Sequence, residues 1–143
     1  MKKIKVLISE EKINNRLDEL ANQIMDEYKG KDIVFLCILK GSIFFTVELA
    51  KRIKNNIQFE FVEVSSYENN ESTGKVKLNK DITQSIEGKE VIIIEDIVDT
   101  GRTLAFLKAD YVGFAIEDKF VVGYGLDDEQ NLRNLNYIGY IEE

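Results

Sequence analysis

The chain has 143 residues, a length that favours one domain, and its 26 acidic and 19 basic residues give a formal net charge of −7. This charge disfavours general binding to nucleic acid, because such a surface repels polyanions. The chain contains no histidine, which excludes Ser-His and Cys-His nucleophile pairs and histidine-ligated zinc. Proton transfer is therefore expected from carboxylate, lysine, tyrosine or cysteine side chains.

The location predicted from the sequence is the cytoplasm. The lone Cys37 has no partner for an internal disulfide and lies in an apolar run, which is typical of a buried, reduced thiol. No apolar run approaches the roughly 18 residues that a membrane span needs. The start, MKKIKVLISE, is too short and polar for a signal peptide.

The first third of the chain predicts two helices around a buried strand. Residues Ser9–Tyr28 place apolar side chains at helical spacing, with Ser9 as the cap and Gly30 after the end. Ile33–Leu39 is apolar at every position, as in a strand covered on both faces of a parallel sheet. A Lys-Gly-Ser turn leads to a second helix at Ser42–Ile53, so these elements begin a βαβ unit.

The rest of the sequence predicts further strands of the same α/β domain. This single domain is taken to span residues 1–143. Ile57–Ser65 reads as a half-buried strand, Glu68–Gly74 as a polar loop, and Lys75–Asp81 as a hairpin partner. Val91–Ile94 is a second fully apolar strand. The later elements are a short helix and three strands: Leu104–Lys108, Tyr111–Ile116, Phe120–Leu126 and Tyr137–Ile141.

The join at Lys108-Ala109 is too short for a parallel crossover. Such a connection needs about a dozen or more residues, usually a full helix plus loops, yet the sequence between Glu95 and Tyr111 offers only about two turns of helix and no return loop. Either the two strands are not parallel neighbours or a segment is missing here. A segment of roughly 25–30 residues would satisfy the length of a βαβ unit.

The stretch Val91–Thr103 carries the clearest chemical signal. A buried strand leads to Glu95 and Asp96, at the end of the sheet where open α/β folds bind ligands. The turn Asp99–Thr103 offers backbone amides, hydroxyls and a helix N-terminus, which suit a phosphate dianion. Two acids beside a phosphate site are explained by ribose hydroxyls or Mg²⁺ as ligands.

These thirteen residues resemble the phosphoribosyl diphosphate (PRPP) signature of type I phosphoribosyltransferases. Leu39–Ser42, Ser65–Tyr67 and Asp110–Leu135 are similar, in order, to parts of hypoxanthine (hypoxanthine-guanine) phosphoribosyltransferases. The resemblance implies an α/β fold with a mostly parallel sheet flanked by helices and a small hood formed by the chain termini. It also implies purine salvage, in which PRPP and hypoxanthine, or guanine, give IMP or GMP and diphosphate with Mg²⁺ as cofactor.

The resemblance assigns roles to residues of the PRPP site. Asp99 is implied to be the general acid/base at purine N7, and Leu39–Lys40 to be a cis peptide. The residues implied to hold the 5-phosphate are Thr100, Gly101, Arg102 and Thr103. Those implied to hold diphosphate are Lys40, Gly41 and Arg133. Glu95 and Asp96 are expected at the ribose hydroxyls and, with Asp127, at the metal.

The resemblance extends to the purine and to a lid. Phe120 is implied to stack on the base, Val121 to meet its edge, and Ser66 with Tyr67 to close over the site. Relatives carry a further strand and a base-reading lysine loop, which nothing here matches and which would fall between Lys108 and Ala109. Full activity is expected if the given chain omits these residues, and weak discrimination between purines if it truly lacks them.

Two other functions remain open at this point. A non-catalytic PRPP-binding regulator on the same fold would keep the phosphate turn, although the net charge of −7 argues against the nucleic-acid binding of such proteins. A receiver-like switch domain would form an acyl phosphate and ignore PRPP. The resemblance also implies a homodimer or homotetramer, with no nucleic-acid or membrane partner.

Overall fold

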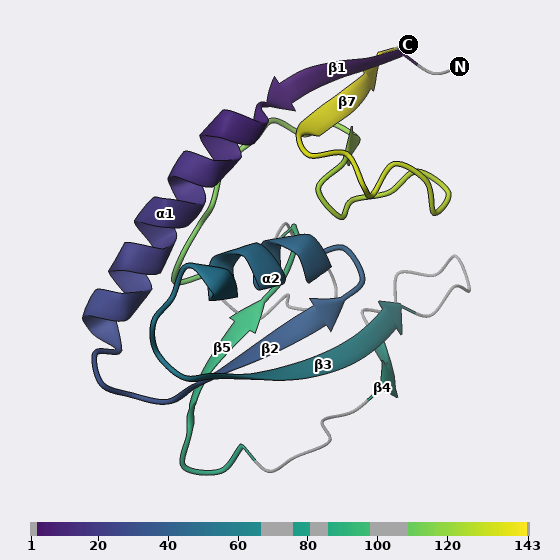
Figure 1. The fold of residues 1–143 in the computed structure, drawn as a ribbon. Helices are drawn as coiled ribbons and strands as arrows, with labels where there is room; N and C mark the ends of the chain where they lie inside the picture. The colour runs from purple at the N-terminus through teal and green to yellow at the C-terminus, as the bar shows by residue number, and fades with distance from the viewer. Residues whose placement is uncertain (1–2, 67–75, 81–85, 98–108, 143) are drawn as a thin grey trace.

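The computed structural model describes residues 3–66, 76–80, 86–97 and 109–142, which form two sheets and two helices (Figure 1). In chain order the elements are β1 (Lys3–Ile8), α1 (Glu10–Glu27), β2 (Ile33–Leu39), α2 (Ile43–Lys51), β3 (Ile57–Ser66), β4 (Val76–Lys80), β5 (Glu90–Ile94), β6 (Val121–Val122) and β7 (Ile138–Glu142). None of the described helices is long and apolar enough to cross a bilayer.

The larger sheet has the strand order β4-β3-β2-β5. Strand β2 pairs in parallel with β3 and with β5, while β4 pairs antiparallel with β3. The apolar run of β2 is buried along nearly its whole length, as expected for a central strand of a parallel sheet. The predicted mostly parallel sheet is therefore confirmed, and so is the predicted hairpin between β3 and β4.

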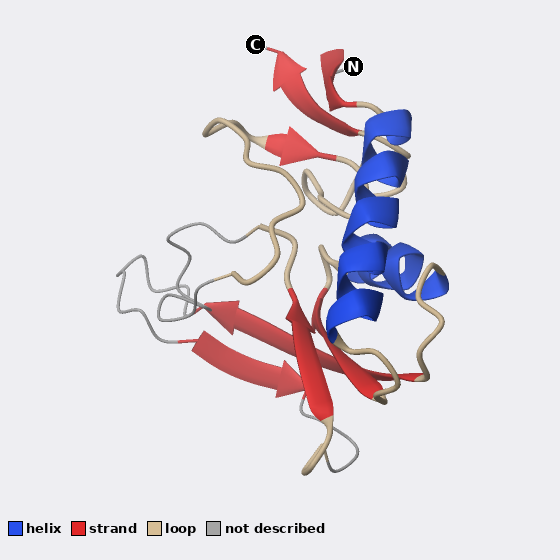
Figure 2. Cartoon of the chain, turned by 90° about the vertical axis from the view of Figure 1, so that its left-hand side faces the viewer, coloured by secondary structure: helices blue, strands red, loops and turns tan. Residues whose placement is uncertain are grey.

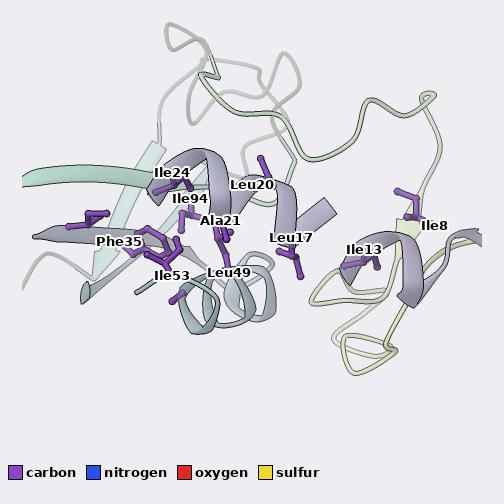
Figure 3. Close-up of a cluster of buried hydrophobic side chains, with 12 residues drawn as sticks. Ile8, Ile13, Leu17, Leu20, Ala21, Ile24, Phe35, Leu49, Ile53 and Ile94 are labelled. Atoms are coloured by element: carbon purple, nitrogen blue, oxygen red, sulfur yellow. The ribbon is translucent and has the colours of Figure 1, made fainter. Parts of the chain in front are cut away.

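Helix α1 covers the sheet with one apolar stripe. The Ser9 hydroxyl accepts a hydrogen bond from the Lys12 amide at 3.2 Å and caps the helix, and Gly30 follows the helix with φ of 74°. Figure 3 shows the stripe packed in one apolar cluster with side chains of α2, β2 and β5. Its members on α1 are Ile13, Leu17, Leu20, Ala21 and Ile24. Burial of this stripe fixes α1 over the sheet.

The smaller sheet joins the two ends of the chain (Figures 1 and 2). Strand β7 lies between β1 and β6 and pairs antiparallel with both. Lys5 Nζ lies 2.9 Å from Glu142 Oε1, an ion pair across β1 and β7. The hood formed by the chain termini is confirmed, although β1 itself was not among the elements predicted from the sequence.

Two predicted strands need correction. Residues 111–116 form no strand, and the Arg16 guanidinium on α1 instead donates to the carbonyl oxygens of Val112 at 2.6 Å and Gly113 at 2.8 Å. The strand predicted at Phe120–Leu126 is limited to β6, because positive φ angles at positions 123–125 turn the chain. The predicted loop 68–74 and helix 104–108 lie outside the described residues.

Candidate active site

The turn after β2 and the acidic pair after β5 meet at one edge of the parallel sheet. The two strands run in parallel, so their carboxyl ends lie side by side. A Cβ atom added to Gly41 would overlap Asp96 Oδ2, which shows how closely the turn approaches the carboxylate. The structure thus brings together the residues predicted for diphosphate and for ribose.

A third segment, the loop at positions 123–133, closes on the same turn. A Cβ atom added to Gly125 would overlap the Gly41 carbonyl oxygen, and Gly125 has φ of 99°. The Gly125 amide donates to the Arg133 carbonyl at 2.8 Å, and Arg133 Nη1 donates to the Gly125 carbonyl at 2.6 Å. The Leu39–Lys40 peptide bond is cis, as predicted.

The acidic pair is held by its own backbone. The Asp96 amide donates to Glu95 Oε1 at 2.9 Å, and the Ile97 amide donates to Asp96 Oδ1 at 2.7 Å. Burial, followed by the hydrogen bond and charge of Asp96, raises the pKa of Glu95 to about 8. Glu95 therefore keeps its proton at neutral pH, and a cation or hydroxyl donors beside it would favour the charged form.

Asp127 and Arg133 are engaged with each other within the C-terminal loop. Arg133 Nη2 lies 3.4 Å from Asp127 Oδ1, and Asp127 Oδ2 accepts from the Gln130 amide at 2.8 Å. Within residues 3–66, 76–80, 86–97 and 109–142, no three metal-ligating side chains gather, so Asp127 does not join the acidic pair. Two carboxylates suffice for Mg²⁺, which commonly takes its other ligands from substrate phosphates and water.

The two residues predicted for the purine lie in different surroundings. Val121 is buried in β6 and lines a cavity of about 780 Å³ together with Glu95 and Asp96. Phe120 is 62% exposed and is not among the residues lining that cavity. The structure therefore places Val121, but not Phe120, against the cavity that the acidic pair borders.

Most of the remaining predicted residues lie outside the part of the chain that the structure describes. The catalytic candidate, the phosphate turn and one lid residue lie outside the described residues: Asp99, Thr100, Gly101, Arg102, Thr103 and Tyr67. Ser66 is the last residue of β3. The acidic pair, the Lys40–Gly41 turn and the C-terminal loop therefore make up the described part of the site.

Ser42 and Gly125 help to shape the turn after β2, and the sequence did not identify either as a site residue. Ser42 is fully buried and its hydroxyl donates to the Ile38 carbonyl at 2.7 Å, which ties the turn after β2 to the strand. Cys37 is buried and its Sγ lies 3.2 Å from that hydroxyl, so its place is structural. Gly125 fell within the strand predicted at Phe120–Leu126, and its contact with Gly41 is long-range and left no local pattern.

Comparison with known proteins identifies the family. Residues 8–109 match the phosphoribosyl transferase domain. The hypoxanthine-guanine phosphoribosyltransferase of Streptococcus thermophilus is 38% identical over 168 residues, covering 97% of this chain and 93% of that protein. This chain belongs to the hypoxanthine-guanine phosphoribosyltransferase family. The resemblance noted in the sequence is thereby confirmed.

Structural similarity agrees with this family. A crystal structure of a hypoxanthine-guanine phosphoribosyltransferase from Bacillus anthracis matches with a TM-score of 0.92 and 40% identity, covering 99% of this chain and 100% of that one. The chain is also 40% identical to a bifunctional TilS/HprT protein of Listeria innocua, with 96% of the chain aligned. It spans only 26% of that longer protein.

The alignments with relatives extend over more positions than this chain has residues. The alignment with the Streptococcus thermophilus protein runs over 168 positions and includes 97% of the 143 residues here, about 139. About 29 positions of that alignment therefore have no counterpart in this chain. The match to the phosphoribosyl transferase domain ends at Ala109, beside the join that is too short for a crossover.

Proposed function

We propose that this chain is a purine salvage transferase that moves the phosphoribosyl group of PRPP to hypoxanthine, or guanine, and releases diphosphate. The observation that carries the proposal is the contact of Gly41 with Asp96, where the turn after β2 meets an acidic pair at the carboxyl edge of a parallel sheet. Membership in the hypoxanthine-guanine phosphoribosyltransferase family supports the same reaction.

The chain's own groups account for the binding of PRPP. The carboxylates of Glu95 and Asp96 accept hydrogen bonds from the two ribose hydroxyls. Lys40, the Gly41 amide and Arg133 hold the diphosphate, and the turn from Thr100 to Thr103 holds the 5-phosphate. PRPP is thereby fixed at both ends, which leaves its C1 atom facing the purine.

Proton transfer and exclusion of water fall to other residues. As the purine bonds to C1 and the bond to diphosphate breaks, the base loses the proton on N7, and the Asp99 carboxylate accepts it. In this proposal Val121 meets the edge of the base, and Phe120, which is exposed between the cavity-lining Lys119 and Val121, stacks on it. Ser66 with Tyr67 covers the site against water. Glu95 and Asp96 would hold Mg²⁺, which would supply charge that stabilises the departing diphosphate, and Asp127 would have to exchange its ion pair with Arg133 for the metal to join them.

Replacement of Asp99 tests this assignment. Asp99→Asn should lower the rate of IMP formation by about 10²–10⁴-fold, because the proton acceptor is lost, and leave the Kd for PRPP nearly unchanged. Ultraviolet absorbance follows IMP formation and calorimetry gives the Kd. Asp26→Asn on α1 is the control and should keep full turnover. Full turnover by Asp99→Asn would contradict the role of Asp99, whereas tight PRPP binding by a wild-type chain without turnover would indicate a non-catalytic PRPP-binding regulator.

We also infer a cytoplasmic homodimer or homotetramer. The buried, free Cys37 suits a reducing compartment. Light scattering after size-exclusion chromatography measures the oligomeric mass, and a monomer at micromolar concentration would contradict the inferred assembly.

A further inference from the structure

The segment at positions 109–120, which runs beside α1 toward β6, borders the site without forming a helix or strand (Figure 1). Among the described residues, none of its amides or carbonyls bonds to another backbone group. Residues 111–119 line the cavity of about 780 Å³ together with the acidic pair. The segment ends at Phe120 and continues into Val121, the two residues proposed for the purine. The contacts that hold the 109–120 segment therefore shape the purine end of the site.

A side chain of α1 supplies donors to this backbone. Arg16 Nη2 donates to the Val112 carbonyl at 2.6 Å, and Arg16 Nε donates to the Gly113 carbonyl at 2.8 Å. A guanidinium presents its N–H groups in a rigid fork, so one side chain fixes two successive peptide carbonyls. Arg16 Nη1 donates to Glu19 Oε1 at 3.1 Å on the same helix, which orients the guanidinium. Two carbonyls that lack backbone partners thus find their donors on α1.

Two side chains of the 109–120 segment make further contacts, one near each end. The Tyr111 hydroxyl is hydrogen-bonded to Glu27 on α1. Lys119 Nζ lies 4.0 Å from the centre of the Tyr140 ring on β7. Each of these contacts holds the tip of a side chain, whereas Arg16 holds the backbone itself. Arg16 is therefore the residue that fixes the path of the segment along α1.

We propose that Arg16 is a positioning residue for the purine end of the site, an inference that rests on the proposed function. By fixing Val112 and Gly113 against α1, Arg16 sets where the chain enters β6 and so where Phe120 and Val121 meet the base. Each guanidinium nitrogen already has an acceptor, so Arg16 acts through the segment and not on a ligand. The ribose and phosphates are bound by other residues in the proposed function, so their binding should not depend on Arg16.

Two ligands that differ in the base test the proposal. IMP carries a purine, whereas PRPP carries ribose and phosphates without a base. Arg16→Met should raise the Kd for IMP about tenfold, as expected if only about one molecule in ten keeps the segment in place, and should leave the Kd for PRPP nearly unchanged. Arg16→Lys keeps the charge but not the fork, and should recover part of the affinity for IMP. Calorimetric titration measures both constants.

Trypsin measures the position of the segment without any ligand. Cleavage after Lys119 releases residues 120–143, and Arg16→Met should speed this cut about tenfold, because a segment without its anchor opens more often. Mass spectrometry follows this one fragment. Glu19→Gln leaves the carbonyl contacts of Arg16 in place and should change neither the Kd values nor the cleavage. Arg52→Met removes an arginine that joins α1 to α2, and should lower the Tm without changing the ratio of the two Kd values.

An unchanged Kd for IMP in Arg16→Met, or unchanged cleavage after Lys119, would overturn the inference. An equal rise in the Kd values for IMP and PRPP would also overturn it, because Arg16 would then act on the shared ribose phosphate or on the fold as a whole. If Arg16→Met does not fold, Arg16→Lys undergoes the same test, with a smaller rise expected for IMP alone. A wild-type chain that binds neither ligand would refute the proposed function, and this inference with it.

Discussion

Replacement of Gly41 by alanine separates the role of the site from the stability of the fold. The added Cβ would overlap Asp96 Oδ2, so the carboxylate must rotate away. Asp96 is exposed and its rotation breaks the 2.7 Å hydrogen bond from the Ile97 amide, a loss of about 1 kcal/mol because water replaces it. Under the proposed function, the displaced carboxylate no longer meets the ribose. Loss of a charged hydrogen bond to ligand, about 1.5–3 kcal/mol, should weaken PRPP binding by roughly 10- to 100-fold.

Calorimetric titration with PRPP and Mg²⁺ and urea denaturation measure the two effects of Gly41→Ala. The matched control is Gly113→Ala, where an added Cβ meets no atom within 4 Å, and both quantities should stay at wild-type values. Gly125→Ala is the contrasting variant, because φ of 99° and an overlap with the Gly41 carbonyl should cost about 2–4 kcal/mol of folding stability. An unchanged Kd in Gly41→Ala, or a stability loss equal to that of Gly125→Ala, would refute the reasoning.

Three further variants probe charge, loop and helix. The unfolded chain loses the Glu95 proton near pH 4.5, whereas the native state keeps it up to a pKa of about 8. Between these two pH values the free energy of unfolding therefore falls as pH rises. Glu95→Gln should remove that decline, measured as the difference between urea midpoints at pH 5 and pH 8.5, and an identical decline in both proteins would contradict it. Arg133→Met should cost about 1–3 kcal/mol in urea denaturation, because the Gly125 carbonyl and Asp127 lose their partner, and Arg133→Lys should recover part of the loss. Ser9→Ala should cost about 1 kcal/mol and lower the Tm by about 2–4 °C, whereas Ser9→Asp should restore the cap.

The parts of the fold that the sequence predicted are those determined by local patterns. The unbroken apolar run of β2 and the stripe of α1 are signatures of burial that need no knowledge of the partner. β1 left no such signature, because it is a short strand stabilised by pairing with residues 130 or more positions away. Pairing between the two chain ends is a long-range property that single-strand patterns do not encode.

The candidate site was predicted as a set of residues but not as a set of contacts. The strand-end motif identified Asp96 and the family resemblance identified Gly41, while the approach of Gly125 to Gly41 depends on how the C-terminal loop folds back. The raised pKa of Glu95 likewise depends on burial beside Asp96 in the folded chain. Residue type indicated the chemistry, whereas the tertiary structure determined the protonation state.

The strand predicted at residues 111–116 is incorrect for a physical reason. Alternating apolar residues suit a strand only where a neighbouring strand offers backbone partners. Arg16 instead holds the carbonyls of Val112 and Gly113 against α1, so this segment does not pair with the larger sheet.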